Sequence, residues 1–166
     1  MRADDRLWLS KSWTTREPRP SESGEEYHFV DRATFEAAIA ADQFLEWAEF
    51  HGHLYGTPQP AAPEGCDLLL EIEVQGAEQV RAQRPDAEVF LILPPSMERL
   101  EERLRTRGDD EKHIVDRLAS APGELERAYR LDPHVIVNDD VERASEEILS
   151  ILGELRRQRR DLSSKD

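Results

Sequence analysis

The sequence predicts an α/β domain, a parallel sheet flanked by helices with a smaller mixed β region attached. Three apolar runs carry this prediction, because their composition is typical of strands buried on both faces of a parallel sheet. They cover residues 67–74, 88–93 and 134–137. Since segments with helical periodicity lie between and after these runs, the strands are expected to be joined by crossover helices.

The helical segments have clear starts and apolar stripes. Ser96 can cap a helix in which Leu100 and Leu104 lie on one stripe. A second helix is expected from about residue 110 to 129, and a third over residues 141–160. The amphipathic pattern of all three predicts that they cover the faces of the sheet.

The chain before the first apolar run predicts a different arrangement. Residues 11–24 are rich in Arg, Pro, Ser and Thr, which is typical of a loop. Short strands are expected at 27–30 and 44–50, with Asp31 as the cap of a helix between them. We therefore predict a smaller, partly antiparallel region over residues 27–55.

The composition limits the classes of partner. With 22 basic and 36 acidic side chains, the net charge of -14 repels nucleic acid and anionic membranes, so neither is an expected partner. Cys66 is the single cysteine, which excludes an internal disulfide and a cysteine-rich zinc site. No apolar stretch approaches the roughly 20 residues of a membrane span, and nothing marks the chain for export, so the cytoplasm is the expected compartment.

Two arginines could hold an anionic ligand despite the acidic composition. Arg16 and Arg19 lie three positions apart in a proline-rich loop. Their planar guanidinium groups match a phosphate, and hydroxyls of Ser12 or Tyr27 could complete the hydrogen bonding. The alternative is a solvated basic turn with no ligand.

Glu46 is the second candidate, because it falls among aromatic residues in the expected strand at 44–50. A half-buried carboxylate requires a partner. Tyr55 and Thr57 follow closely enough for these side chains to converge on one ligand. A carboxylate selects guanine, which offers an N1–H, over adenine, which does not. The alternative is an ordinary strand carboxylate.

Six segments follow one another in a characteristic order: SKSWTTREPRP, EEYHFVDRATFEAAI, FLEWAEFHGHLYGTP, LLLEIEVQGAEQV, LILPPSMERLEERLRTRG and VIVNDD. In order and spacing they resemble the guanylate kinases, a family of nucleoside monophosphate kinases, over essentially the whole chain. No segment is decisive alone, but the series is highly specific. The resemblance implies one guanylate kinase-like domain over 1–166, with a P-loop-kinase-like fold, a GMP-binding lobe at 27–57 and a helical lid at 103–121.

The resemblance also implies roles for individual residues. The positions that bind the GMP phosphate in the family fall on Ser12, Arg16, Arg19, Tyr27 and Tyr55. The guanine-reading positions fall on Glu46 and Thr57. A further acidic position near the base and sugar falls on Glu73, where the family usually has the shorter aspartate, and Glu71 is expected to assist.

The lid and the ATP site are implied in the same way. Arg103, Arg107 and Arg117 match the positions that neutralise the transferring phosphoryl group in the family, although they could also be solvated helix charges. Asn138 and Asp139 match the turn beside the adenine of ATP, although the same residues are common helix caps. The family uses ATP as co-substrate with Mg²⁺, and no metal ligands are predicted in the protein itself.

Guanylate kinases also have a first strand and a GxxxxGK[ST] loop that holds the ATP phosphates, and none of the 166 residues matches them. We expect that Met1 lies inside a longer reading frame or that the chain has been trimmed. Two functions follow: ATP-dependent phosphorylation of GMP to GDP, or a catalytically inactive guanylate kinase-like module that binds GMP or a protein. The sequence does not predict an oligomeric state.

Overall fold

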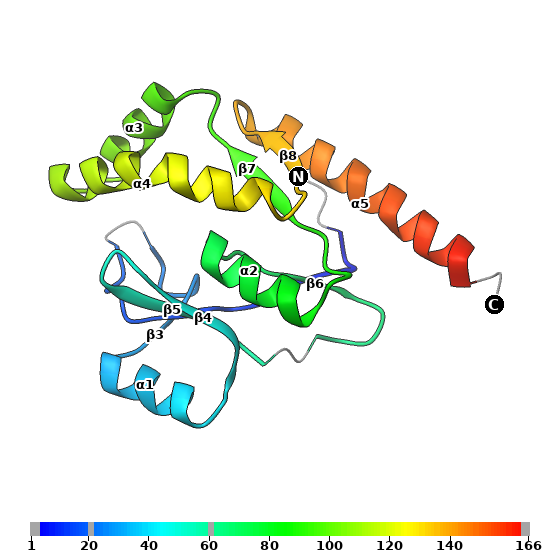
Figure 1. Cartoon of the computed structure of the whole chain (residues 1–166), viewed down its shortest axis with the longest axis horizontal. Helices are drawn as coiled ribbons and strands as arrows, with labels where there is room; N and C mark the ends of the chain where they lie inside the picture. Colours follow the sequence, from blue (N-terminus) through cyan, green and yellow to red (C-terminus); the bar gives the residue numbers. More distant parts are fainter. Residues whose placement is uncertain (1–3, 20–21, 60–61, 164–166) are drawn as a thin grey trace. The chain divides into compact units, whose positions relative to one another are not determined.

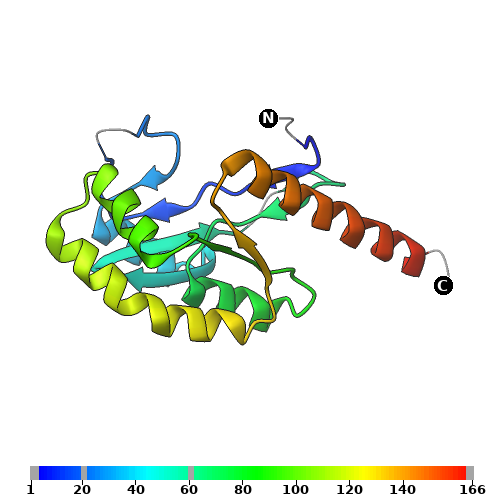
Figure 2. The same ribbon diagram turned by 90° about the horizontal axis from the view of Figure 1, so that it is seen from above.

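The computed structural model describes residues 4–19, 22–59 and 62–163, which fold into two compact units. One unit ends at Ala87 and the other begins at Glu88. Each unit combines strands with helices, as Figures 1 and 2 show, and this confirms the predicted α/β class.

The first unit contains a four-stranded mixed sheet in the order β3-β2-β5-β4. Its strands are β2 (Trp13–Thr14), β3 (His28–Phe29), β4 (Phe44–Phe50) and β5 (His53–Pro58). β4 and β5 form a hairpin whose turn residues, His51 and Gly52, have φ angles of 49° and 81°. Left-handed backbone at both positions is the geometry of a two-residue type I′ turn. The prediction of a loop over 11–24 is wrong at β2, because pairing with β3 and β5 overrides the local polar composition.

Helix α1 (Arg32–Ala40) begins where the sequence predicts. The Asp31 carboxylate accepts a hydrogen bond from the Thr34 backbone N–H at 2.7 Å, which confirms Asp31 as the cap. The rings of Phe35 and Phe44 stack with their centroids 4.6 Å apart. Phe35, Ala38, Phe44 and Leu54 form a buried core cluster in this unit. It fixes α1 on the sheet that carries Glu46.

The first unit also holds a parallel strand pair and a second helix: β1 (Leu7–Leu9), β6 (Asp67–Leu69) and α2 (Val74–Gln83). The predicted strand at 67–74 is wrong beyond Leu69, because Val74 already begins α2. The carboxylate of Glu73 caps the helix and ends the extended backbone before it. α2 packs against β4, as Figure 1 shows.

The second unit follows the predicted helix pattern. Its elements are β7 (Phe90–Leu93), α3 (Met97–Thr106), α4 (Glu111–Tyr129), β8 (His134–Val137) and α5 (Val141–Ser163). β7 and β8 pair in parallel, and α5 packs against β8. The Ser96 hydroxyl accepts from the Arg99 N–H at 3.3 Å, which confirms the predicted cap of α3. Asp110, which was not predicted as a cap, accepts from the His113 N–H at 2.9 Å at the start of α4.

The predicted burial of the parallel strands on both faces is wrong for the described chain. In β8 only Ile136 is fully buried, whereas Val135 and Val137 are 39% and 40% exposed. Ile92 in β7 and Leu69 in β6 are also partly exposed. The reason is that β1–β6 and β7–β8 are two-stranded sheets, and neither has a further described strand beside it. Among the described residues, no helix is both long and apolar enough to cross a membrane.

Candidate functional site

Arg16 and Arg19 share the carboxylate of Glu22, and these three residues are called the arginine cluster. Arg16 donates from Nη1 and Nη2 to Glu22 Oε2 and Oε1 at 2.9 and 2.8 Å. Arg19 donates from its backbone N–H to Oε2 at 2.7 Å and from Nη1 to Oε1 at 3.3 Å. The geometry is a bidentate guanidinium–carboxylate pair reinforced by a second arginine.

Aromatic rings enclose Arg16. Its guanidinium carbon lies 5.4 Å from the ring centroid of Tyr27 and 5.5 Å from that of Phe29, within the range of cation–π attraction. The side chain is only 11% exposed, and the hydrogen bond with Glu22 is the main cause that raises the pKa of Arg16. Tyr55 raises the same pKa further. Arg16 is therefore a fixed positive charge in a largely desolvated position.

The two tyrosines of the predicted site lie together beside the arginine cluster. The ring centroids of Tyr27 and Tyr55 are 6.2 Å apart. Burial raises the pKa of the Tyr27 hydroxyl, and the negative charge of Glu71 raises it further, which places Glu71 on this side of the unit. Ser12 is buried directly before β2, but its hydroxyl makes no hydrogen bond with the arginine cluster among the described residues. The structure thus joins four of the five predicted phosphate-binding residues.

Glu46, Thr57, Glu73 and Gly76 form a second group, called the carboxylate cluster. Glu46 projects from β4 and is 4% exposed, and its Oε1 accepts a hydrogen bond from the Thr57 N–H at 2.8 Å. Oε2 faces the first turn of α2, where a Cβ atom on Gly76 would lie only 2.5 Å from it. Glycine at position 76 is therefore what leaves room for the Glu46 carboxylate.

Glu73 has a structural role in the same cluster. Its Oε2 accepts from the Gln75 N–H at 2.7 Å, and its Oε1 accepts from the Gly76 N–H at 2.6 Å. Both oxygens thus satisfy the otherwise unpaired start of α2. The Glu73 side chain, which was expected to lie near the guanine, therefore caps α2 in this structure.

The carboxylates of the two clusters have opposite pKa shifts. The hydrogen bonds from Arg16 are the main cause that lowers the pKa of Glu22 to about 2. Burial raises the pKa of Glu46; contacts with Thr57 oppose this effect, and the charge of Glu73 adds to it. A carboxylate whose pKa is raised in the free protein gains from a ligand that offers it N–H donors.

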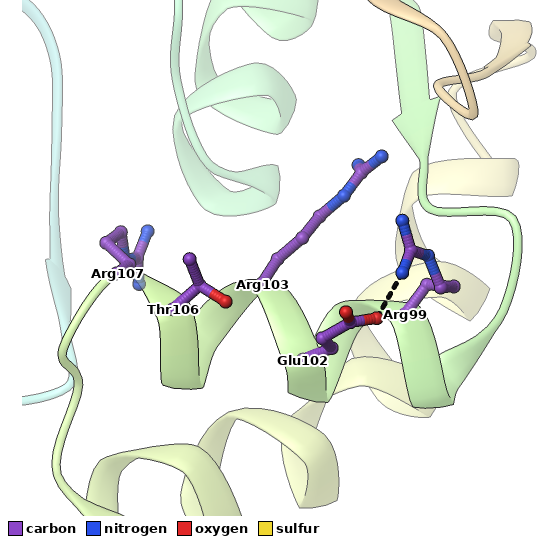
Figure 3. A pocket seen from close by; sticks show the side chains of 5 residues that line it. All are labelled: Arg99, Glu102, Arg103, Thr106 and Arg107. Carbon is purple, nitrogen blue, oxygen red and sulfur yellow. Dashed lines mark hydrogen bonds and ion pairs between the residues drawn. The ribbon is translucent and has the colours of Figure 1, made fainter.

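The predicted lid arginines all belong to the second unit. Arg103 projects from α3, and its Nη2 donates to the carbonyl of Asn138 at 2.7 Å. Arg107 caps the end of α3 and forms an ion pair with Asp109, whose side chain is 5% exposed. Arg117 lies on α4, in the following helix. Arg103 and Arg107 line a pocket of about 390 Å³ together with Arg99, Glu102 and Thr106 (Figure 3).

The predicted adenine-side residues lie between β8 and α5. Asn138 donates its backbone N–H to the Leu93 carbonyl at 2.7 Å, while its side-chain Oδ1 is buried without a hydrogen-bond partner. Asp139 accepts from Arg143, which is the main cause that lowers its pKa. Of these two side chains, only Asn138 presents an unsatisfied acceptor that a ligand could use.

Comparison with known proteins decides the family. A sequence profile of the guanylate kinases matches residues 2–155. This chain belongs to the guanylate kinase family. A guanylate kinase of Thermus thermophilus is 49% identical over 158 residues, which are 92% of this chain and 71% of that protein. The guanylate kinase of Thermosynechococcus vestitus is 53% identical over 144 residues, 83% of this chain and 75% of that protein.

The fold agrees with a solved member of the guanylate kinase family. The crystal structure of guanylate kinase from Anaplasma phagocytophilum matches with a TM-score of 0.72 at 32% identity. The match covers 90% of this chain and 76% of that chain. The α/β, P-loop-kinase-like fold expected from the sequence is thereby confirmed.

Three further residues shape the site but were not predicted from the sequence. Glu22 is the common partner of Arg16 and Arg19, Gly76 makes room for Glu46, and Asp109 pairs with Arg107. The spacing of Glu22, three residues after Arg19, is the one signal that could have suggested a turn with an internal ion pair. The role of Gly76 could not be predicted, because contacts between β4 and α2 leave no pattern in the local sequence.

Proposed function

We propose that this chain binds GMP in its first unit and, as a guanylate kinase, transfers a phosphoryl group from ATP to give GDP and ADP. The observation that carries the proposal is the presence, in one unit, of a paired arginine cluster and a buried carboxylate with a raised pKa. A nucleoside monophosphate needs these two features, one for its phosphate and one for its base.

We assign the phosphate of GMP to Arg16, Arg19, Tyr27, Tyr55 and Ser12. Two guanidinium groups and two phenol hydroxyls supply donors that match a dianion. The desolvated position of Arg16 strengthens its attraction for a phosphate relative to an exposed arginine. Glu71 lies near Tyr27 and is assigned a supporting role.

We assign the guanine edge to Glu46 and Thr57, with Glu73 beside them. The Glu46 carboxylate can accept from both the N1–H and the exocyclic amine of guanine. Adenine has no N1–H and would leave the buried carboxylate unpaired, a cost of about 1–3 kcal/mol. The Thr57 hydroxyl is buried beside the Glu46 carboxylate and opposes the rise of its pKa, so the two side chains can meet the same base.

We propose that residues 27–57 act as the GMP-binding lobe and residues 103–121 as the lid. Arg103, Arg107 and Arg117 would neutralise charge on the transferring phosphoryl group, and Asn138 and Asp139 would border the adenine of ATP. Phosphoryl transfer depends mainly on positioning and charge stabilisation, so the loss of one such arginine is expected to lower the rate by about 10³-fold.

Magnesium would enter with ATP. No group of three or more His, Cys, Asp or Glu side chains in residues 4–19, 22–59 and 62–163 is arranged to hold a metal ion. We assign Mg²⁺ to the phosphates of the nucleotide, which commonly bind this ion together with only one or two carboxylates. The proposed partners are GMP and ATP, and the proposed setting is purine nucleotide metabolism in the cytoplasm.

Calorimetry and a rate assay test this function. We expect GMP to bind and AMP to bind at least about 10-fold more weakly, because only GMP satisfies Glu46. With ATP and Mg²⁺ present, GDP should form, and Arg107→Ala should slow its formation while preserving GMP affinity. Absence of GMP binding at millimolar ligand would contradict the proposal. GMP binding without GDP formation would favour a binding module.

A further inference from the structure

The guanidinium group of Arg16 keeps a buried N–H donor that has no hydrogen-bond partner among the described residues. Guanidinium has five N–H donors: two on the edge between Nη1 and Nη2, two on the edge between Nη2 and Nε, and one more on Nη1. Glu22 and the Glu17 carbonyl take the donors of Nη1 and one donor of Nη2. On the other edge, which Nη2 shares with Nε, the Nε–H is buried and has no hydrogen-bond partner. Burying this donor unpaired costs free energy, so the edge is suited to an anionic ligand.

We infer that Glu22 is a positioning residue that turns the Nε and Nη2 edge of Arg16 toward the phosphate of GMP and stays in place when GMP binds. This inference rests on the proposed function. It assigns to Glu22 the orientation of the phosphate-binding arginine, not a contact with the ligand.

The local backbone holds Glu22 in the position that this role requires. The Glu22 N–H donates to the Arg19 carbonyl at 3.0 Å, while the Arg19 N–H donates to Glu22 Oε2 at 2.7 Å. These reciprocal bonds fix the carboxylate within one turn. Arg16 is anchored separately, because its backbone N–H donates to Thr14 Oγ1 at 3.1 Å and Thr14 is fully buried. The pair is therefore ordered from both sides.

A second interpretation of Glu22 predicts the opposite change in GMP affinity when its charge is removed. If Glu22 only occupied the site as a substitute for phosphate, GMP would have to displace it, and removing its charge would tighten GMP binding. Coulomb attraction alone also predicts tighter binding, since loss of one carboxylate raises the local positive charge. A positioning residue predicts weaker binding, because Arg16 would lose its fixed orientation before the ligand arrives.

Two measurements on the full chain separate these interpretations. The first compares affinities for GMP and guanosine in the wild type, Glu22→Gln and Glu22→Asp. We expect Glu22→Gln to weaken GMP binding by roughly 10- to 100-fold and to leave guanosine binding unchanged, with partial recovery in Glu22→Asp. The second is the ¹⁵N order parameter of Arg16 Nε without ligand, which should fall from a rigid value to below about 0.6 in Glu22→Gln.

Glu26→Gln is the matched control. Glu26 lies in the same loop and caps the turn at Ser23 and Gly24, so its loss removes an equal charge and a local hydrogen-bond acceptor. It should change neither GMP affinity nor the Arg16 signal. Equal or tighter GMP binding by Glu22→Gln, or parallel losses for GMP and guanosine, would overturn the inference. A wild type that binds no GMP would refute the proposed function, and the order parameter would still decide whether Glu22 fixes Arg16.

Discussion

The arginine cluster and the carboxylate cluster lie in one unit, and each contains a glutamate that is mostly withdrawn from solvent. The Glu22 side chain is 13% exposed and meets two arginines. Glu46 is 4% exposed and meets a backbone N–H, a neighbouring carboxylate and no arginine among the described contacts. The first arrangement lowers a carboxyl pKa and the second raises one, although the residue type is the same.

The two glutamates therefore have different effects on the stability of the free protein. Glu22 stabilises the free protein, because its charged form is favoured in the folded state. Glu46 destabilises the free protein at neutral pH, because its charged form is desolvated without an opposite charge. A group that is unfavourable until a ligand arrives has the most to gain from the correct ligand. The comparison predicts that substitutions in the two clusters have opposite effects on stability but the same direction of effect on GMP binding.

Removing Arg16 should have the largest effect. Arg16→Ala takes away the guanidinium that makes two hydrogen bonds to Glu22 and leaves that carboxylate with Arg19 alone. We expect GMP affinity to fall by about 100-fold or more and the protein to lose about 2–3 kcal/mol of unfolding free energy. Calorimetry and urea unfolding measure the two effects. Arg19→Ala should cause a smaller loss of both, since the Arg19 side chain is 26% exposed against 11% for Arg16.

Glu46→Gln should raise the stability of the free protein while it lowers the preference for GMP. The amide keeps an acceptor for the Thr57 N–H but removes the buried charge, so the free protein should be stabilised by about 1 kcal/mol. The preference for GMP over AMP should fall by about 10- to 100-fold, measured as a ratio of calorimetric affinities. Glu49→Gln is the control, because Glu49 lies on the same strand and is 52% exposed. Unchanged discrimination in Glu46→Gln would remove Glu46 from the base site.

Gly76→Ala tests whether the space beside Glu46 matters. The added methyl would lie 2.5 Å from Glu46 Oε2, so the carboxylate must move. We expect GMP affinity to fall by about 10-fold, although alanine by itself favours a helix by about 1 kcal/mol over glycine. Gly123→Ala supplies the control, since that helical glycine has no neighbour within 4 Å and should gain stability without a change in GMP affinity. If Gly76→Ala bound GMP normally, Glu46 would not need its observed position.

Much of this arrangement could be predicted from the sequence where the signal is local. The helix caps Asp31 and Ser96 lie where a short polar side chain precedes an apolar stripe. The strand at Phe44–Phe50 and the candidate Glu46 within it followed from the same kind of pattern. The family resemblance then gave the residues that the structure joins around Arg16.

Long-range contacts could not be predicted in this way. β2 becomes a strand because β3 and β5 flank it, and nothing in Trp13–Thr14 itself requires that. Glu73 ends a run of apolar residues by capping α2, so the predicted strand stops early. Gly76 and Glu46 are far apart in sequence, and only the packing of α2 on β4 shows why one of them must be glycine.

The pH dependence of stability is the smallest expected effect, and it tests the comparison of Glu22 with Glu46 most directly. The pKa of Glu22 is lowered from an ordinary 4.5 to about 2, so its stabilisation is complete above pH 4.5 and is lost as the pH falls toward 2. The pKa of Glu46 is raised, so its destabilisation is absent at low pH and grows as the pH rises above 4.5. In urea unfolding, the free energy of unfolding of Glu22→Gln should lie below that of the wild type at neutral pH and approach it as the pH falls toward 3. The free energy of unfolding of Glu46→Gln should be close to that of the wild type at pH 3 and exceed it increasingly as the pH rises to 8. Parallel pH profiles for the two variants would show that the two carboxylates do not have opposite environments.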